Sequence, residues 1–289
     1  MSIFKTIETK YNYLSLGAGV QSSTLAFMCM KGEITPKPDF AVFADTQAEP
    51  QEVYDYLKYV EQNVDFPIHI VTAGSLEKEV IKEKIATDKA INYKEGEKYS
   101  VIQIPAFGIL PNGNITAAIG RKCTADYKIK PVTDFVKKEY NINPRLKSSI
   151  NLATEYIGIS FDEIQRMKPS RDKWRVKRFP LIEKQIKRSD CLKWIRDNGY
   201  EEPPRSACYF CPFHDNNEWR RLRNKHPKEF QKAIQFDKDV RKKMGQYKHN
   251  KMTVYLHKDC KPLDQIDFDN EEDKGQMNWF NECEGMCGI

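Results

Sequence analysis

The chain has 289 residues, a length that suits one large α/β domain or one α/β domain followed by a small C-terminal module. Its hydrophobic fraction of 40% and aromatic fraction of 11% are sufficient for a folded core and exclude a disordered chain. The 47 basic and 41 acidic residues give a formal net charge of +6, which permits an anionic ligand or a nucleic acid without requiring either.

The sequence shows neither a membrane span nor a secretory signal. Its apolar runs are shorter than the roughly 18 residues that a spanning helix needs. The N-terminal segment, residues 1–11, is interrupted by ionisable side chains and has no apolar centre. We therefore expect a cytoplasmic protein without membrane contact, whose eight cysteines serve as thiols, metal ligands or redox groups rather than disulfides.

Short apolar runs alternate with amphipathic segments along the first two thirds of the chain. This alternation predicts an α/β fold with a doubly wound, mainly parallel sheet, which binds ligands at the carboxyl ends of its strands. Predicted strands cover residues 11–16, 40–44, 68–72 and 156–159, and predicted helices cover residues 22–30, 51–64, 76–89, 128–140, 188–198 and 218–243.

Residues 90–122 break the alternation. The strong turn signal Pro111-Asn112-Gly113-Asn114 lies between two strand-like segments, residues 101–107 and 115–119, and predicts a hairpin. A second break, the segment 200–206 with two consecutive prolines, is typical of a linker. We divide the chain there into an α/β domain, residues 1–205, and a small helical, cysteine-containing region, residues 206–289.

The first strand leads into a glycine-containing loop, Gly17-Ala18-Gly19-Val20-Gln21-Ser22-Ser23, which opens a helix. Small residues let the backbone approach a phosphate, and a helix N-terminus offers N–H groups and the positive end of its dipole. Ser22 and Ser23 add hydroxyl groups. The alternative is a strand-to-helix turn that needs glycine for its geometry alone.

Three later segments place polar residues after strands or at the start of helices. Asp45 and Thr46 end the second strand and can either contact a nucleotide or cap the next helix. Arg121 and Lys128 offer charge-assisted contacts to phosphate or sulfate. Arg166 follows in a segment that begins at residue 158, and can contact a nucleotide or lie on a helix surface.

Cysteines form a fifth pattern. Cys208-Tyr209-Phe210-Cys211 is a C-x-x-C sequence, in which a tight turn can direct both sulfurs to one metal ion or cluster edge. Zinc is an alternative because His214 follows closely. Cys283 and Cys287 lie in the tail, where a flexible end could deliver a thiolate nucleophile.

The helical segment from residue 218 is rich in arginine and lysine, and could follow the backbone of a nucleic acid. Acidic residues dilute this charge, so the alternative is a solvated helix face. The acidic residues are Glu218, Glu229, Asp237 and Asp239.

Taken in order, these segments resemble the phosphoadenylylsulfate (PAPS) reductase family of the adenine-nucleotide α-hydrolase, or PP-loop ATP pyrophosphatase, superfamily. The resemblance covers roughly residues 11–212, with the tail as a separate partial match. This chain has Gln21 where the family's loop has Asp, Thr124 in place of the second Cys of a pair, and Ser160 in place of an Arg. The resemblance implies an adenine-nucleotide domain with a HUP/PP-loop-like fold. It places nucleotide contacts at Ser15, Gly17, Gly19, Gln21, Ser22, Ser23, Asp45, Thr46, Arg121, Lys128, Gly158 and Arg166.

The resemblance also implies a chemistry. The iron–sulfur members pair an early Cys with a later C-x-x-C, so Cys123 joins Cys208 and Cys211 as expected ligands of a [4Fe–4S] cluster. Cys191 is the first choice for the fourth ligand and a C-terminal thiol the second. Catalytic roles fall to Arg121 and to a tail thiol, and Mg²⁺ is a further expected ion.

Three functions are compatible with the resemblance. A reductase would bind adenylylsulfate or its 3′-phosphate and receive electrons from a thiol donor such as thioredoxin. An ATP pyrophosphatase or sulfurtransferase would thiolate a nucleic acid. A weakly catalytic relative would bind nucleotide within a mobile-element or CRISPR-associated nucleic-acid assembly.

Overall fold

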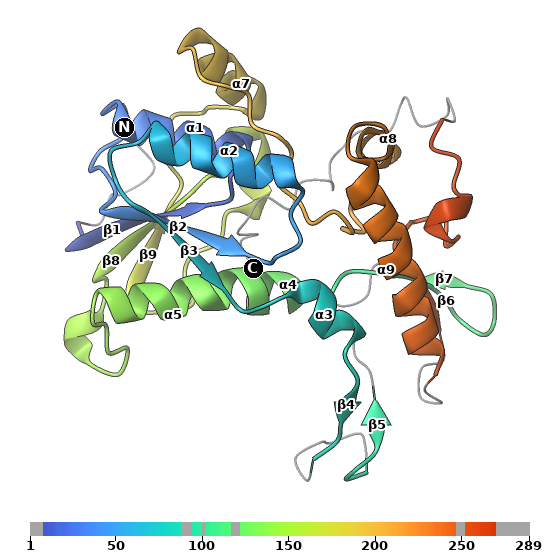
Figure 1. Ribbon diagram of the computed structural model, residues 1–289. Helices are drawn as coiled ribbons and strands as arrows, with labels where there is room; N and C mark the ends of the chain where they lie inside the picture. The colour runs from blue at the N-terminus through green and yellow to red at the C-terminus, as the bar shows by residue number, and fades with distance from the viewer. Residues whose placement is uncertain (1–7, 88–93, 100–101, 117–121, 247–251, 270–289) are drawn as a thin grey trace.

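A computed structural model describes residues 8–87, 94–99, 102–116, 122–246 and 252–269. Two parts lie side by side in it (Figure 1). One is a parallel sheet covered by helices, and the other gathers the two long C-terminal helices with two small antiparallel sheets. None of the described helices is both long and apolar enough to cross a membrane.

The first part contains a five-stranded sheet with the strand order β3-β2-β1-β8-β9, in which every pairing is parallel. The predicted α/β class with a parallel sheet is therefore confirmed. The chain runs outward from β1 through β2 to β3 and then returns to the other side of β1, so the strand order reverses at β1. The strands are β1 (Tyr11–Leu16), β2 (Phe40–Asp45), β3 (Ile68–Thr72), β8 (Ala153–Ile157) and β9 (Arg175–Arg178).

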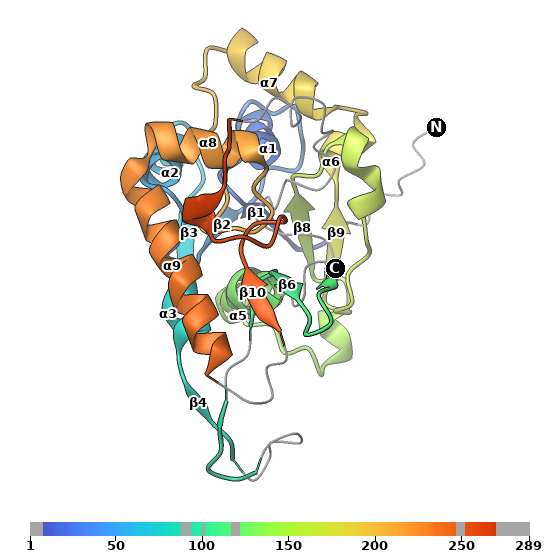
Figure 2. The same ribbon diagram turned by 90° about the vertical axis from the view of Figure 1, so that its right-hand side faces the viewer.

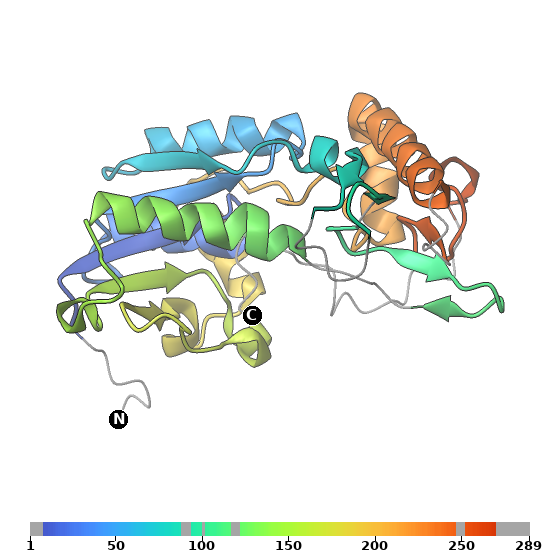
Figure 3. The ribbon, with the colours of Figure 1, turned by 90° about the horizontal axis from the view of Figure 1, so that it is seen from below.

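Helices cover both faces of this sheet (Figures 1 and 3). Side chains alternate along β1, so Leu14 and Leu16 pack in the core beneath the helices of one face, while Tyr13 packs with Trp174 beneath the other. The first face carries α1 (Val20–Met30), α2 (Gln51–Gln62), α6 (Pro180–Glu183) and α7 (Arg188–Asp197), and the second carries α5 (Lys130–Glu139).

One ion pair lies inside the second of these cores. Arg175 Nη1 on β9 is 3.2 Å from Glu155 Oε2 on β8, and both side chains are almost fully buried. Ser15 donates a 2.8 Å hydrogen bond to the other carboxylate oxygen, and Arg175 donates to Thr133 on α5. These partners compensate the cost of burying two charges and tie β1, β8, β9 and α5 together.

The second part has its own core, built from residues of α3 (Leu76–Ile81), α8 (Asn216–Lys225), α9 (Pro227–Gly245) and the strands beside them. Figure 2 shows β10 (Thr253–Tyr255) beside β6 (Phe107–Ile109), which in turn pairs with β7 (Ile115–Thr116). The predicted hairpin around Pro111–Asn114 is thus found within the described residues. The short elements are β4 (Lys84–Ile85), β5 (Lys98–Tyr99), α4 (Lys122–Thr124), η1 (Ala125–Ile129), η2 (Lys147–Ser149), η3 (Phe161–Arg166) and η4 (Leu263–Gln265).

Two predicted helices differ from the observed ones. The helix predicted over residues 76–89 ends at Ile81, because the next residues pair as β4 with β5 and hairpin pairing outweighs local helix propensity. The helix predicted over residues 218–243 is two helices. His226 has φ −131° and ψ 59° before Pro227, because proline disfavours the helical conformation in the residue before it.

Candidate functional site

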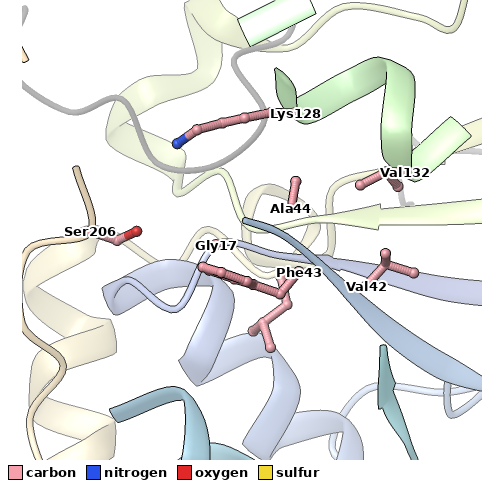
Figure 4. A pocket seen from close by; sticks show the side chains of 8 residues that line it. Gly17, Val42, Phe43, Ala44, Lys128, Val132 and Ser206 are labelled. Carbon is pink, nitrogen blue, oxygen red and sulfur yellow. The ribbon is translucent and has the colours of Figure 1, made fainter. Parts of the chain in front are cut away.

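A pocket opens at the carboxyl ends of β1 and β2, where the fold predicts ligand binding (Figure 4). It is small and partly open to solvent. Three polar residues line it, Gly17 by its backbone and Lys128 and Ser206 by their side chains, and none of its lining residues is acidic. The remaining walls are apolar and consist of Leu16, Val42, Phe43, Ala44 and Val132.

The glycine-containing loop borders this pocket and leads into α1. Its backbone N–H groups at Gly17 and Gly19 both donate to Ser22 Oγ, at 3.1 and 3.3 Å. Ala18 adopts a left-handed conformation with φ 56°, which turns the chain sharply from β1 into the helix. The loop therefore wraps around the Ser22 hydroxyl at a helix N-terminus, whereas Ser23 is fully buried on the helix.

Gly158 lies directly against the start of α1. A Cβ atom at this position would be 2.7 Å from both the backbone nitrogen and the Cα atom of Ser22. Any larger residue at this position would push the N-terminus of α1 away from the end of β8, because the atoms in contact belong to the backbone and cannot shift without moving the helix. The predicted nucleotide role of Gly158 stays a prediction, but the structure gives it a clear part in holding the loop.

Gln21 connects the loop to the segment after β8. Its side-chain nitrogen donates to Glu163 Oε2 at 3.1 Å and to Ser160 Oγ at 3.4 Å. Arg166 in turn donates to the other oxygen of Glu163. Arg166 therefore lies near the loop through Glu163, but it is not among the residues that line the pocket.

Lys128 reaches the pocket from a π-helical turn, η1, just before α5. Pro131 has no N–H and cannot donate to the carbonyl of Tyr127, so the regular hydrogen-bond ladder is interrupted here. Lys130 N instead donates to the carbonyl of Ala125, five residues back. Turns of this kind often occur at functional sites because they redirect one side chain. The Lys128 side chain extends toward the side of the pocket where Ser206 lies (Figure 4).

The loop after β2 meets the C-x-x-C sequence next to this pocket. Thr46 Oγ1 is 3.3 Å from Cys208 Sγ, and Tyr209 N donates to the carbonyl of Ala48 at 2.9 Å. Asp45 accepts hydrogen bonds from Gln47 N and from the Tyr54 hydroxyl. It does not cap the next helix as the alternative expected, because the N-cap of α2 is Pro50 and has no side-chain cap hydrogen bond. Burial raises the pKa of the Cys208 thiol well above its usual range, and the Glu49 carboxylate raises it further.

Three of the four predicted metal ligands lie in or against one hydrophobic core, and the fourth lies in another. Cys123, Cys208 and Cys211 belong to the same core of the second part, while Cys191 is buried in the core beneath α1. Among the described residues, no group of three or more His, Cys, Asp or Glu side chains is arranged to hold a metal ion. A four-cysteine cluster with Cys191 therefore does not fit these positions, because Cys191 is buried in a different core from the other three cysteines.

His214 is the residue that the sequence suggests as a partner of a zinc ion. Its Nε2 donates to the carbonyl of Cys208 at 3.0 Å, and its ring packs edge-on against Trp219. Burial, the larger cause, and the positive charge of Arg205 lower its pKa to about 3. The ring is a neutral part of the core, and the zinc alternative has no support here.

Several predicted residues lie outside the described residues, namely Arg121 and the tail cysteines Cys283 and Cys287. Their expected catalytic roles stay predictions. Ser15 is described, but its hydroxyl donates to Glu155 inside the sheet and not to the pocket.

The basic run on α8 is largely neutralised within the chain. Arg221 pairs with Glu52 at 2.6 Å and with Glu218 at 2.7 Å. Arg220 and Arg223 both pair with Asp269, at 3.4 and 2.8 Å. These contacts favour the solvated helix face over a nucleic-acid surface on this helix.

Sequence reasoning misses two residues of the site. Glu49, whose carboxylate is 3.6 Å from the Lys128 ammonium, lies in the segment after β2, and its position in the sequence suggests no role. Ser206 falls in the segment predicted to be a linker. The one available hint for Glu49 is that it is a single acidic residue between Ala48 and Pro50, after a buried strand. Nothing in the local sequence points to Ser206.

No protein-family model matches the chain, and no curated protein matches it in sequence. Several solved structures are similar to it, of which two are described. One is a phosphate complex of PAPS reductase from Candida auris, with 15% identity, a TM-score of 0.40, and coverage of 68% of this chain and 76% of that one. The other is the U34-tRNA thiolase NcsA from Methanococcus maripaludis with its [4Fe–4S] cluster, with 10% identity, a TM-score of 0.38, and coverage of 83% and 75%. Both TM-scores are below 0.5, so the function of this protein has to be inferred from its own side chains.

Proposed function

We propose that the pocket binds the phosphate or sulfate groups of an adenine nucleotide, and that the protein is an enzyme that uses this nucleotide for sulfur chemistry. The observation that carries the proposal is the buried ammonium of Lys128, which lines a pocket together with the loop at the N-terminus of α1. A helix N-terminus and a buried ammonium both stabilise negative charge. Gly17 and Lys128, which belong to two of the motifs that resemble the PAPS reductase family, both line this pocket.

The apolar walls of the pocket exclude water from the surroundings of Lys128. Val42, Phe43 and Val132 are almost fully buried, and they keep water away from the phosphate end. In such surroundings the attraction between an ammonium and a phosphate is stronger than in water.

Two reactions suit a nucleotide held in this way. In the first, a thiolate attacks the sulfur of adenylylsulfate or of its 3′-phosphorylated form, and the nucleotide phosphate leaves with the electrons of the S–O bond. In the second, an oxygen of a nucleic acid attacks the α-phosphorus of ATP and pyrophosphate leaves, after which a sulfur nucleophile displaces AMP. The first requires a thiol donor such as thioredoxin, and the second a nucleic-acid acceptor.

A binding panel tests the proposal. Calorimetry with ATP, AMP, adenylylsulfate and its 3′-phosphate should find at least one ligand for the wild-type protein. Gly19→Asp places a negative charge at the helix N-terminus and should weaken that ligand at least tenfold, since a charge-assisted contact contributes about 1.5–3 kcal/mol. Gly245→Asp is a matched control, because a Cβ atom at that position would meet open space within 4 Å among the described residues. Equal affinities for the Gly19→Asp variant and the wild type would place the nucleotide elsewhere.

Product analysis separates the reactions. Sulfite and AMP, or its 3′-phosphate, identify the reductase, whereas pyrophosphate and AMP identify the ATP-dependent enzyme. Binding without turnover would leave a nucleotide-binding subunit. Iron and sulfide counts after anaerobic purification test, independently of activity, whether the protein holds an iron–sulfur cluster without Cys191 as a ligand.

A further inference from the structure

The pocket's ammonium already has a carboxylate partner. Lys128 Nζ is 3.6 Å from Glu49 Oε1, and the two side chains are only 9% and 1% exposed. Lys128 lines the pocket, but Glu49 does not. The carboxylate therefore lies outside the pocket lining, where it compensates a positive charge that would otherwise be buried without a partner.

The loop that carries Glu49 is fixed by the second part of the molecule. The neighbouring Ala48 carbonyl accepts from Tyr209 N at 2.9 Å, and Thr46 contacts Cys208. Cys208 Sγ also lies 4.0 Å from the same Glu49 oxygen that faces Lys128. The position of the carboxylate is thus set by protein contacts and needs no ligand.

The contact between the two charges is long. Ammonium and carboxylate groups that share a charge-assisted hydrogen bond are typically about 2.7–2.9 Å apart. At 3.6 Å the pair gains electrostatic attraction without a hydrogen bond of that length. A phosphate oxygen in the pocket could approach the ammonium more closely than Glu49 does.

We propose that Glu49 is an internal counterion that competes with an anionic ligand for Lys128 and so sets the affinity of the pocket for that ligand. The inference rests on the proposed function, since it takes the ligand to be a phosphate- or sulfate-bearing nucleotide. When the ligand binds, its anionic group and the carboxylate share one ammonium and repel each other. Glu49 thereby weakens binding while keeping the unliganded pocket near neutral charge.

The test compares Glu49→Gln with the wild type, using inorganic pyrophosphate as the probe in calorimetry. Glutamine has nearly the shape of glutamate but no charge, so the variant should bind pyrophosphate at least tenfold more tightly. Glu52→Gln is the matched control, because Glu52 pairs with Arg221 on α8 and does not line the pocket. Its affinity should equal that of the wild type. The double variant Glu49→Gln/Lys128→Met should lose the gain.

Glu49→Asp provides a second variant if Glu49→Gln does not fold. The shorter side chain draws the charge away from Lys128, so pyrophosphate should bind about threefold more tightly than to the wild type. Unchanged or weaker binding in the folded variants would overturn the inference, as would pyrophosphate binding to none of them. A wild type that binds nucleotide but shows no gain on substitution would leave the proposed function standing and remove only the role of Glu49.

Discussion

Two buried ion pairs in this protein have similar chemistry and different surroundings. Glu155 and Arg175 lie inside the sheet, 3.2 Å apart, with Ser15 and Thr133 as additional hydrogen-bond partners. Glu49 and Lys128 lie 3.6 Å apart, and the lysine borders the pocket. The first pair closes a core, whereas the second places its cation where a ligand can reach it. Burial of a charge pair therefore does not by itself distinguish a structural role from a binding role, but access to a pocket does.

The largest effect is expected in the pair within the sheet. Arg175→Met removes the cation and leaves Glu155 buried without it, which should lower the free energy of unfolding by about 3–5 kcal/mol. Urea denaturation followed by circular dichroism measures this loss. Nucleotide affinity, measured where the variant is still folded, should change little. A stable variant would show that the pair does not hold the sheet together.

A second effect separates the pocket pair from the first. Lys128→Met should weaken the binding of an adenine nucleotide at least tenfold, because one charge-assisted contact of about 1.5–3 kcal/mol is lost. Calorimetry gives the affinity, and urea denaturation of the same sample gives the stability. If Lys128→Met retains nucleotide affinity while its stability falls as far as in Arg175→Met, then the Glu49–Lys128 pair is also structural and does not bind the nucleotide.

A third change acts on the loop beside the pocket without touching a charge. Gly158→Ala places a Cβ 2.7 Å from the Ser22 backbone, so the start of α1 must shift. We expect the free energy of unfolding to fall by about 1–3 kcal/mol, as for other overpacked sites, and nucleotide affinity to fall with it. Ala153→Gly at the start of β8, the strand that leads to Gly158, is a control that removes bulk, and it should reduce stability while leaving affinity unchanged.

The smallest effect concerns a buried group that avoids charge. His214 has a pKa of about 3 in the folded protein, mainly because of burial, whereas an unfolded histidine titrates near about 6.5. As the pH falls below about 6.5, His214 takes up a proton in the unfolded state but not in the folded state, so the free energy of unfolding decreases. The loss should be about 1–2 kcal/mol between pH 7 and pH 5.

His214→Gln isolates this contribution, because glutamine keeps an N–H donor for the Cys208 carbonyl but has no charge to gain. Urea denaturation at both pH values should show a smaller loss of stability in the variant than in the wild type. An equal loss would mean that other groups cause the pH dependence.

The sequence predicts the sheet well because each of its first strands is a short apolar run bounded by turn or helix signals. It also predicts that Gly17 and Lys128 belong to one site, since both follow from motifs with a local signature. The C-terminal part is harder. Helix α3 stops where β4 begins, and only the pairing with β5, which is not encoded locally, determines that boundary.

The less predictable site residues depend on contacts between distant segments. Ser206 reaches the pocket although it lies far along the chain from Gly17, and the position of Glu49 is fixed by the loop at Tyr209. Cys191 illustrates the reverse case. Its spacing suggests a metal ligand, but the face of α7 on which it lies turns its sulfur into the core beneath α1.

The π-helical turn at η1 makes the site sensitive to chain length. In an α-helix each residue turns by about 100° around the helix axis. Adding or removing one residue therefore rotates the side chains before that point relative to the side chains after it. η1 contains such an extra residue and carries Lys128 directly before α5, which packs on the sheet. A deletion of Ile129 that restored a regular helix would leave the sheet contacts of α5 in place but rotate Lys128 away from the pocket. Relatives that retain the binding function should thus vary in residue type across this turn more freely than in length.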